Sequence, residues 1–271
     1  MVRSLWTAAT GMIAQQTNID TIANNLSNVN TQGYKTQVNE FKTLLYQTLQ
    51  SKTTSANGAE KPISAQVGLG VRNSAITSIF RQGTPIASDS DTDFMIEGKG
   101  FFALRGADGN TYYTRNGNFQ FALGNNGYML SNMDGLPVLN SNGQPIILSN
   151  NYILSNLSVD KDGRICYPDE ENNAQPIGIT IGVFQFNNPS GLDRLEDTMY
   201  AVSDASGQPI NEATNNGVEK SKIHQNYLEG SNVQVVDEMV SMIVAQRAYE
   251  MNSKAITTSD EMLQQANNLK R

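Results

Sequence analysis

Two long amphipathic segments lie at opposite ends of the chain, about two hundred residues apart. Between Arg3 and Asn30, apolar or small residues recur in steps of three, four or seven: Leu5, Ala9, Met12, Ile19, Ala23 and Leu26. Between Asn232 and Leu269 the same steps connect Val240, Val244, Ala248, Met251, Ala255, Met262, Ala266 and Leu269. This spacing keeps one stripe of each helix facing a partner helix, as in a coiled-coil seam. Both ends of the chain are therefore expected to be long helices that pack side by side.

The C-terminal segment carries a second apolar stripe beside the first, made of Met239, Met242 or Ile243, Tyr249, Ile256 and Leu263. A helix with one partner needs one narrow seam, whereas a helix packed among several neighbours needs a broad apolar face. This width predicts a subunit that packs against copies of itself. The alternative is an ordinary core helix of a globular domain, but no nearby sequence offers enough apolar surface to cover it.

The composition excludes several classes of protein. A formal charge of −7 over 271 residues and a pI near 4.8 argue against a nucleic-acid partner, which requires a basic face. Cys166 is the sole cysteine, so neither an internal disulfide nor a thiolate metal cluster can form. No apolar run reaches the roughly 18–20 residues of a membrane helix. The apolar spacing after Arg3 continues past any cleavage site, which predicts a retained helix rather than a signal peptide.

The region from Gln66 to about Tyr200 changes to a period of two, with segments rich in aromatic and β-branched residues. These segments are 70–72, 75–80, 94–97, 101–104 and 112–115. Turn dipeptides that tolerate positive φ recur between them: Asp108-Gly109, Asn116-Gly117, Asn126-Gly127, Asp134-Gly135, Asn142-Gly143 and Asp162-Gly163. The pattern predicts one antiparallel β-domain of hairpins, closed by a helical turn at Leu192–Leu195.

The expected fold class is α+β, with an antiparallel β-rich domain inserted between terminal helices that form a coiled-coil-like domain. Residues 1–32 are the N-terminal helix, with Gly33 as its C-terminal cap. Residues 33–66 are a connecting arm, either a short helix or an extended segment, with a polar loop at 51–62. Residues 67–225 form the β-rich domain, and residues 226–271 contain the C-terminal helix.

The sequence contains no constellation that predicts catalysis, a cofactor or a metal. His224 is the only histidine, and nothing near it resembles a nucleophile. The run Asp89-Ser90-Asp91-Thr92-Asp93 resembles the start of a calcium loop but lacks the required Gly and Glu at the sixth and twelfth positions. Asp160-Lys161-Asp162-Gly163 fits a hairpin turn as well as a metal site. Gly98-Lys99-Gly100 and Gly68-Leu69-Gly70 do not complete a phosphate-binding pattern.

Two long motifs resemble those of the flagellar rod and hook family. Asn24-Asn25-Leu26-Ser27-Asn28-Val29-Asn30-Thr31-Gln32-Gly33-Tyr34-Lys35 is similar to the family's N-terminal signature. The segment from Tyr227-Leu228-Glu229-Gly230-Ser231-Asn232-Val233 through Ala245-Gln246-Arg247-Ala248-Tyr249-Glu250 is similar to its C-terminal signature. The resemblance covers nearly the whole chain, is weakest over 140–178, and is greatest for the distal rod members.

The resemblance implies a non-enzymatic subunit of the distal rod, the drive shaft that transmits torque from motor to hook. It implies a helical homopolymer that contacts proximal rod and hook proteins at its two ends and surrounding ring (bushing) proteins. It further implies secretion by the flagellar type III export apparatus and a location in the basal body, outside the cytoplasmic membrane. The terminal helices would form the inner tube, and the β-domain the outer layer.

The expected assembly contacts lie on the terminal stripes: Leu5, Met12, Ile19, Leu26, Val240, Val244, Ala248, Met251, Ala255, Met262 and Leu269. Position and resemblance together assign rod stiffness to an arm that includes Leu44, Leu45, Tyr46 and Leu49.

Two alternatives stay open from the sequence. A paralogous proximal rod or hook-type subunit would share the terminal motifs. A secreted β-rich carbohydrate-binding or hydrolytic module would instead require an aromatic strip or a carboxylate cleft.

Overall fold

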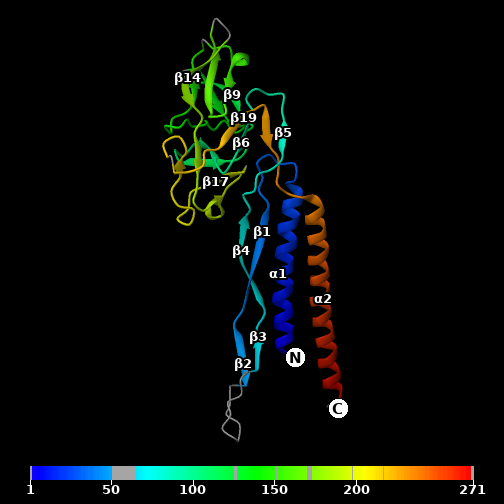
Figure 1. Cartoon of the computed structure of the whole chain (residues 1–271). Helices are drawn as coiled ribbons and strands as arrows, with labels where there is room; N and C mark the ends of the chain where they lie inside the picture. Colours follow the sequence, from blue (N-terminus) through cyan, green and yellow to red (C-terminus); the bar gives the residue numbers. More distant parts are fainter. Residues whose placement is uncertain are drawn as a thin grey trace. The chain divides into compact units, whose positions relative to one another are not determined.

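The computed structural model describes residues 2–50, 65–124, 127–150, 152–169, 173–196, 198–215 and 217–269. The fold is α+β, with one long helix near each end of the chain and antiparallel sheets between them (Figure 1). The predicted polar loop at 51–62 lies outside the described residues. The chain divides into two compact units. We call them the helical unit (residues 1–27, 37–77 and 234–271) and the β unit (residues 28–36 and 78–233).

The helical unit contains two antiparallel helices and a long two-stranded ribbon. Helix α1 spans Val2–Ser27 and α2 spans Val235–Asn268. Strand β1 (Gln37–Thr43) pairs with β4 (Val71–Ser78), and β2 (Tyr46–Gln50) pairs with β3 (Ala65–Gly68). Where the structure describes the connecting arm, it is extended over residues 37–50 and 65–66 and contains no helix there, which decides between the two predicted conformations.

The β unit contains the remaining strands, most of them short. They are β5 (Pro85–Ala87), β6 (Phe94–Glu97), β7 (Phe101–Arg105), β8 (Thr111–Thr114), β9 (Gln120–Gly124), β10 (Gly127–Ser131), β11 (Ile147–Leu148), β12 (Ser158–Val159), β13 (Arg164–Pro168), β14 (Ala174–Thr180), β15 (Val183–Gln185), β16 (Asp193–Arg194), β17 (Met199–Ala201), β18 (Ile210–Asn211), β19 (Lys222–Gln225) and β20 (Tyr227–Glu229). Two single-turn 3₁₀ helices lie at Leu154–Asn156 and Pro189–Gly191.

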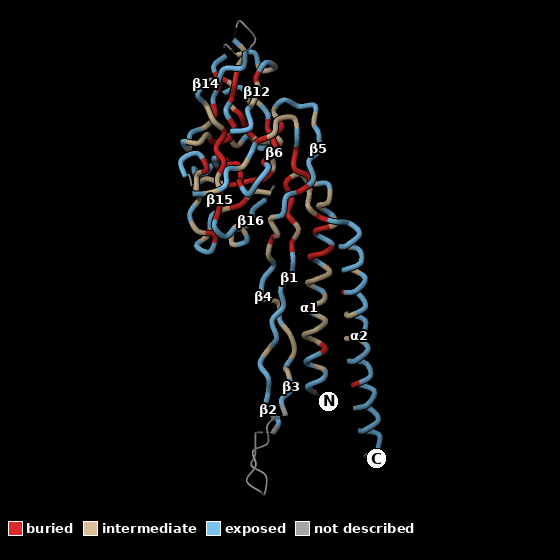
Figure 2. The backbone as a smooth tube through the Cα atoms, in the orientation of Figure 1, coloured by how far each residue is buried: buried red, intermediate tan, exposed pale blue. Residues whose placement is uncertain are grey.

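The largest sheet described in the β unit has six strands in the order β16-β17-β8-β7-β15-β18. Its inner strand β7 is buried on both faces, because successive side chains of a strand point to opposite sides. Phe102 and Leu104 pack into one apolar cluster with residues of β6, β10 and β13, and Phe101 and Ala103 pack into a second cluster with Tyr200. Figure 2 shows that many of the buried residues lie in the β unit.

The predicted hairpin turns are found at four of the six dipeptides. Gly109, Gly135, Gly143 and Gly163 have positive φ, and their turns connect antiparallel segments. Asn126 lies outside the described residues. The prediction for Asn116-Gly117 is wrong, because this dipeptide connects β8 of the six-stranded sheet to β9 of another sheet.

Two further predictions are corrected. The segment Leu192–Leu195 is not a helical turn: the turn lies earlier, at Pro189–Gly191, and residues 193–194 form strand β16. Gly33 does not cap α1, which ends at Ser27. Gly33 has a φ of +69°, and a Cβ there would lie 2.6 Å from the backbone nitrogen of Asn116. Close backbone packing, rather than helix termination, therefore requires glycine at this position.

Candidate assembly surface

Helix α2 packs against α1 in a regular seven-residue register. The Oγ atoms of Ser4 and Ser259 are 3.4 Å apart, and seven residues further along α1 a Cβ on Gly11 would meet the side chain of Asn252. Two heptads beyond Gly11, Nδ2 of Asn25 donates to Oε1 of Glu238 at 3.2 Å. A constant register over these three heptads shows that the helices stay side by side along much of their length.

The packed face of α2 is mostly small or polar. Its buried and half-buried residues are Glu238, Met242, Ala245, Ala248, Asn252, Ser253, Ile256, Ser259 and Leu263. On the facing side of α1, Ala8 and Ala14 are buried and Gly11 lacks a side chain, and the larger Ile22 is buried as well. Small residues let two helix backbones approach closely without requiring a wide apolar seam. The contact between the helices uses Met242, Ile256 and Leu263 but leaves other large apolar residues of α2, such as Val244 and Met251, exposed.

The predicted stripe of α2 lies on another side of the helix and is exposed to solvent. Val244 is 63% exposed and Met251 is 67% exposed, and Val240, Met262 and Leu269 are exposed as well. At 100° per residue this stripe lies about 120° around the helix from the face packed on α1. Figure 2 shows the exposed face along α2. Of the other two predicted residues, Ala255 is exposed and Ala248 is half-buried.

The predicted residues of α1, namely Leu5, Met12, Ile19 and Leu26, are all half-buried. The largest exposed apolar side chains of α1 are ones that the stripe did not include. Trp6 is 69% exposed and Ile13 is 64% exposed. They are seven positions apart and so lie on the same side of the helix. The helical unit thus presents apolar surface from both of its helices.

The arm adds a third apolar surface within the helical unit. Leu45 is 83% exposed, and Tyr46 and Leu49 on β2 are also exposed, whereas Leu44 is half-buried. Large exposed apolar surfaces mark sites of protein interaction in soluble proteins. The residues predicted for assembly and for stiffness are therefore available to a partner, apart from the half-buried ones.

A buried ion cluster in the β unit was not predicted from the sequence. Nζ of Lys35 lies 2.7 Å from Oε1 of Glu229, and Nη1 of Arg115 lies 3.4 Å from Oε2 of Glu229, with all three side chains almost fully buried. Burial is the main cause that lowers the pKa of Lys35 to about 8; the Glu229 carboxylate opposes this shift and Arg115 adds to it. Burial likewise lowers the pKa of Arg115. Charged residues at these positions gave no sequence signal of burial.

Residues of the two terminal signature motifs meet within each unit. In the β unit, Gly33 N–H donates to the carbonyl of Glu229 at 2.8 Å, and Thr36 N–H donates to Oδ1 of Asn232 at 2.7 Å. In the helical unit, Nδ2 of Asn25 donates to Oε1 of Glu238 at 3.2 Å. The motifs therefore act as structural joints that hold the start and the end of the chain together.

The remaining candidates for chemistry have structural partners. His224 Nε2 lies 2.8 Å from Oε2 of Glu97, and this hydrogen bond is the first cause that lowers the pKa of Glu97. Cys166 is a buried free thiol on β13. Among the described residues, no group of three or more His, Cys, Asp or Glu is placed to hold a metal ion. No helix in the described part of the chain is long and apolar enough to cross a membrane.

Three protein-family models match the chain at positions that agree with this architecture. The Flagella basal body rod protein family matches residues 5–35, which contain α1. The Flagellar hook protein FlgE/F/G D1 domain matches residues 95–167 of the β unit. The Flagellar basal body rod FlgEFG protein C-terminal family matches residues 224–269, which contain α2. Paired terminal helices with this β unit between them define an axial protein of the bacterial flagellum.

Relatives extend the match over the full chain. The flagellar basal-body rod protein FlgG of Borreliella burgdorferi is 42% identical over 100% of both chains. FlgG of Bacillus subtilis is 38% identical over 100% of both, and the hook-basal body complex protein FlhP of the same organism is 30% identical over 97% of both. The chain belongs to the FlgG-type flagellar basal-body rod protein family. It is a structural subunit of the distal rod in the flagellar basal body.

Proposed function

We propose that copies of this chain assemble helically through the exposed stripe of α2 and so build the drive shaft between motor and hook. The single observation that supports this is the stripe itself, because α2 satisfies its contact with α1 through other residues. A repeated contact that does not close by rotation builds a helical filament. In the polymer the heptad-spaced helices would pack as a coiled-coil-like layer.

In this proposal, residues 1–32 and 226–271 act as the helical domain, residues 33–66 as the arm and residues 67–225 as the outer β-rich body. The two ends of the polymer contact proximal rod and hook proteins, and ring proteins surround it as a bushing. The chain reaches its site through the flagellar type III export apparatus. Methionines such as Met251 and Met262 suit contacts with neighbours of slightly different shape.

The test replaces Val244, Met251 and Ala255 together with Asp. Burying three unpaired carboxylates in a helix contact is strongly unfavourable, so a strain that makes only this variant should form no distal rod in electron micrographs of isolated basal bodies. The matched control places the same three charges on a third side of α2, with Gln246→Asp, Thr257→Asp and Gln264→Asp. Rods from the first variant, or loss of rods from both, would refute the assignment of this face.

We also propose that no side chain of this chain performs catalysis. His224→Gln combined with Cys166→Ser should leave motility unchanged, since neither residue has the partners that catalysis requires. Loss of swimming with normal rods in micrographs would contradict this.

A further inference from the structure

The negative charge of the chain is concentrated in the β unit. Its two segments contain 10 Lys and Arg residues against 18 Asp and Glu residues, a formal charge of −8, which leaves +1 for the helical unit. Copies of a unit with this charge repel one another when they are held side by side. A polymer of such units therefore needs places where the repulsion is locally reversed.

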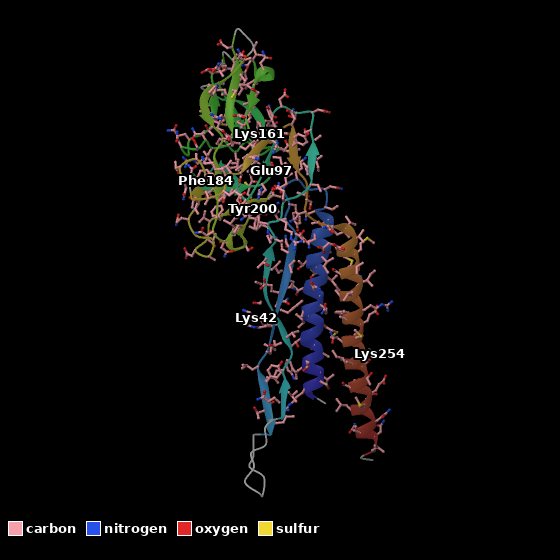
Figure 3. The ribbon with its side chains drawn as sticks, in the orientation of Figure 1. Lys42, Glu97, Lys161, Phe184, Tyr200 and Lys254 are labelled. Carbon is pink, nitrogen blue, oxygen red and sulfur yellow. The ribbon has the colours of Figure 1, made fainter. Side chains whose placement is uncertain are left out.

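Most lysines of the β unit gather in one part of it, beside the carboxylates of Glu97 and Glu219. Four of its five lysines, Lys99, Lys161, Lys220 and Lys222, are exposed, and we call these four the lysine patch. Three of them, with Glu97, Gly98 and Glu219, line a hollow of about 230 Å³. The charges of Lys222 and Lys161 help to lower the pKa of Glu97, after the hydrogen bond from His224. Figure 3 labels Lys161 and Glu97 in this region. No salt bridge within the described residues uses any of the four lysines.

The lysine patch lies beside the β15–β18 edge of the six-stranded sheet. Glu212 directly follows β18, and its Oε2 accepts a hydrogen bond from the backbone nitrogen of Ser221 at 2.6 Å. Ser221 stands between Lys220 and Lys222 in the sequence. Its Oγ accepts a hydrogen bond at 3.1 Å from the backbone N–H of Gly100, the residue after Lys99. Backbone contacts therefore fix most of the patch to this edge.

The opposite edge of the same sheet is acidic. Asp193 lies on the outermost strand β16, Glu196 lies in the turn to β17, and Asp204 follows β17; we call these three the acidic edge. All three are exposed, and none takes part in a salt bridge within the described residues. Arg194, next to Asp193 on β16, donates to Ser78 Oγ. Five strand spacings separate the two edges, or about 24 Å.

We propose that the lysine patch of one copy binds the acidic edge of a neighbouring copy in the rod. Complementary charges on opposite edges of one sheet give a head-to-tail contact, which builds an open filament when its rotation does not close. The contact offsets the repulsion between β units and fixes which neighbour fits, since wrong pairings bring like charges together. The inference rests on the proposed polymer but concerns a surface separate from the stripe of α2.

Paired charge reversals test the contact in strains that make only the stated chains. Lys220→Glu with Lys222→Glu makes both edges acidic, and Asp193→Lys with Glu196→Lys makes both basic. Each double variant alone should form about ten-fold fewer rods, because rim charges act mainly on the rate of association. The two double variants made together should assemble again as an alternating polymer. A variant that carries all four substitutions has both surfaces reversed, so its copies should assemble with one another. It should be excluded from wild-type rods, because each of its surfaces would meet a wild-type surface of the same charge.

Two controls separate a specific contact from a general effect of net charge and from misfolding. Arg105→Glu makes the same change in the net charge of the β unit as either lysine reversal does by itself, half the change of the double variant, but it lies in the β7–β8 hairpin and should not affect rod number. Unfolding midpoints of all purified variants should match that of the unchanged chain, which excludes misfolding. Carbodiimide cross-linking of isolated rods should join lysines of the patch to Asp193 or Glu196 of another copy, distinguished by mixing ¹⁵N-labelled and unlabelled chains.

The outcomes distinguish this contact from the polymer as a whole. Normal rods from both double variants, or no recovery when they are made together, would refute the contact while leaving the role of α2 intact. Cross-links from the patch only to other proteins or to anionic cell-wall polymer would refute it as well, and would identify a different occupant of the patch.

Discussion

Lys35 and Glu229 are 194 positions apart, yet Nζ of one lies 2.7 Å from Oε1 of the other, with both side chains fully buried. Oε1 of Glu229 also accepts the backbone N–H of Gly83 at 2.8 Å, and Lys35 donates to the carbonyl of Arg81 at 2.7 Å. The pair thus connects the segment after α1, the segment before β5 and the end of β20. One carboxylate therefore determines how three distant segments of the β unit meet.

Removal of this carboxylate should destabilise the β unit severely. Glu229→Gln leaves Lys35 and Arg115 as buried cations without a counter-ion, and breaking a buried pair in this way typically costs about 3–5 kcal/mol. Urea unfolding followed by near-ultraviolet circular dichroism measures the change. The exposed Glu219→Gln is the matched control and should shift the unfolding free energy by less than about 0.5 kcal/mol. Equal effects of the two variants would contradict the importance of the cluster.

Stability of the β unit should rise above pH 8. Lys35 has a pKa of about 8 in the fold and 10.5 when unfolded, so between these values the unfolded chain binds more protons and the unfolding free energy increases with pH. Below pH 8 the burial penalty is present in full. The expected increase is of the order of 3 kcal/mol.

Above pH 10 the direction should reverse. Burial raises the pKa of both Tyr113 and Tyr200 from 10.0 to about 12, so the folded chain then binds more protons and loses stability as pH rises. The pH profile should therefore have a maximum near pH 10. Lys35→Met should abolish the rise above pH 8 and retain the loss above pH 10. A wild-type profile that is flat from pH 8 to 10 would show that Lys35 keeps an ordinary pKa.

The contact between the helices should depend on the absence of a side chain at Gly11. A Cβ there would lie 2.8 Å from Nδ2 of Asn252, so Gly11→Leu should push the helices apart and lower the thermal midpoint of the helical circular dichroism signal. Gly11→Ala combined with Asn252→Ala removes the clash and gains about 1 kcal/mol of helix propensity at position 11. The thermal midpoint of this double variant should therefore be higher than that of Gly11→Leu. A higher midpoint for Gly11→Leu would refute the observed register.

The arm should determine how rigid the rod is, since its exposed apolar residues can bridge neighbouring copies. Leu44 N–H donates to the carbonyl of Gly70 at 2.9 Å, so residues 45–69 can be replaced by Asn-Gly without stretching the β1–β4 ribbon. Rods of this variant should be curved or flexible in electron micrographs. Straight rods of normal length would show that stiffness comes from other contacts.

The sequence predicts the helices and the hairpins well because their signals are local. The steps of three and four in the terminal segments identify α1 and α2, and dipeptides such as Asp108-Gly109 identify turns by their backbone preference. Non-local features were missed. Lys35 and Glu229 are charged residues with no periodic signal of burial, and their pairing depends on segments nearly two hundred positions apart.

The difference between residues with and without a hydrophobic signal also explains which residues of α2 the sequence pattern identified. Hydrophobic periodicity finds Val244 and Met251, which are exposed. It does not find Ala245 and Ser259, which are buried on the face packed against α1, because small and polar residues contribute little to an apolar pattern. The predicted second stripe did include Met242, Ile256 and Leu263, which lie half-buried on the packed face.

Burial of Val244 during assembly is the most direct test of polymerisation through α2. A cysteine introduced as Val244→Cys in a Cys166→Ser chain can be labelled with a maleimide, and Gln246→Cys on the polar side of α2 serves as its control. In the monomer both thiols should react at similar rates. In isolated rods the thiol at position 244 should react at least about ten-fold more slowly, as expected for a group buried in a helix contact, while that at position 246 changes less. Equal labelling of position 244 in monomers and in rods that contain the chain would contradict assembly through this stripe.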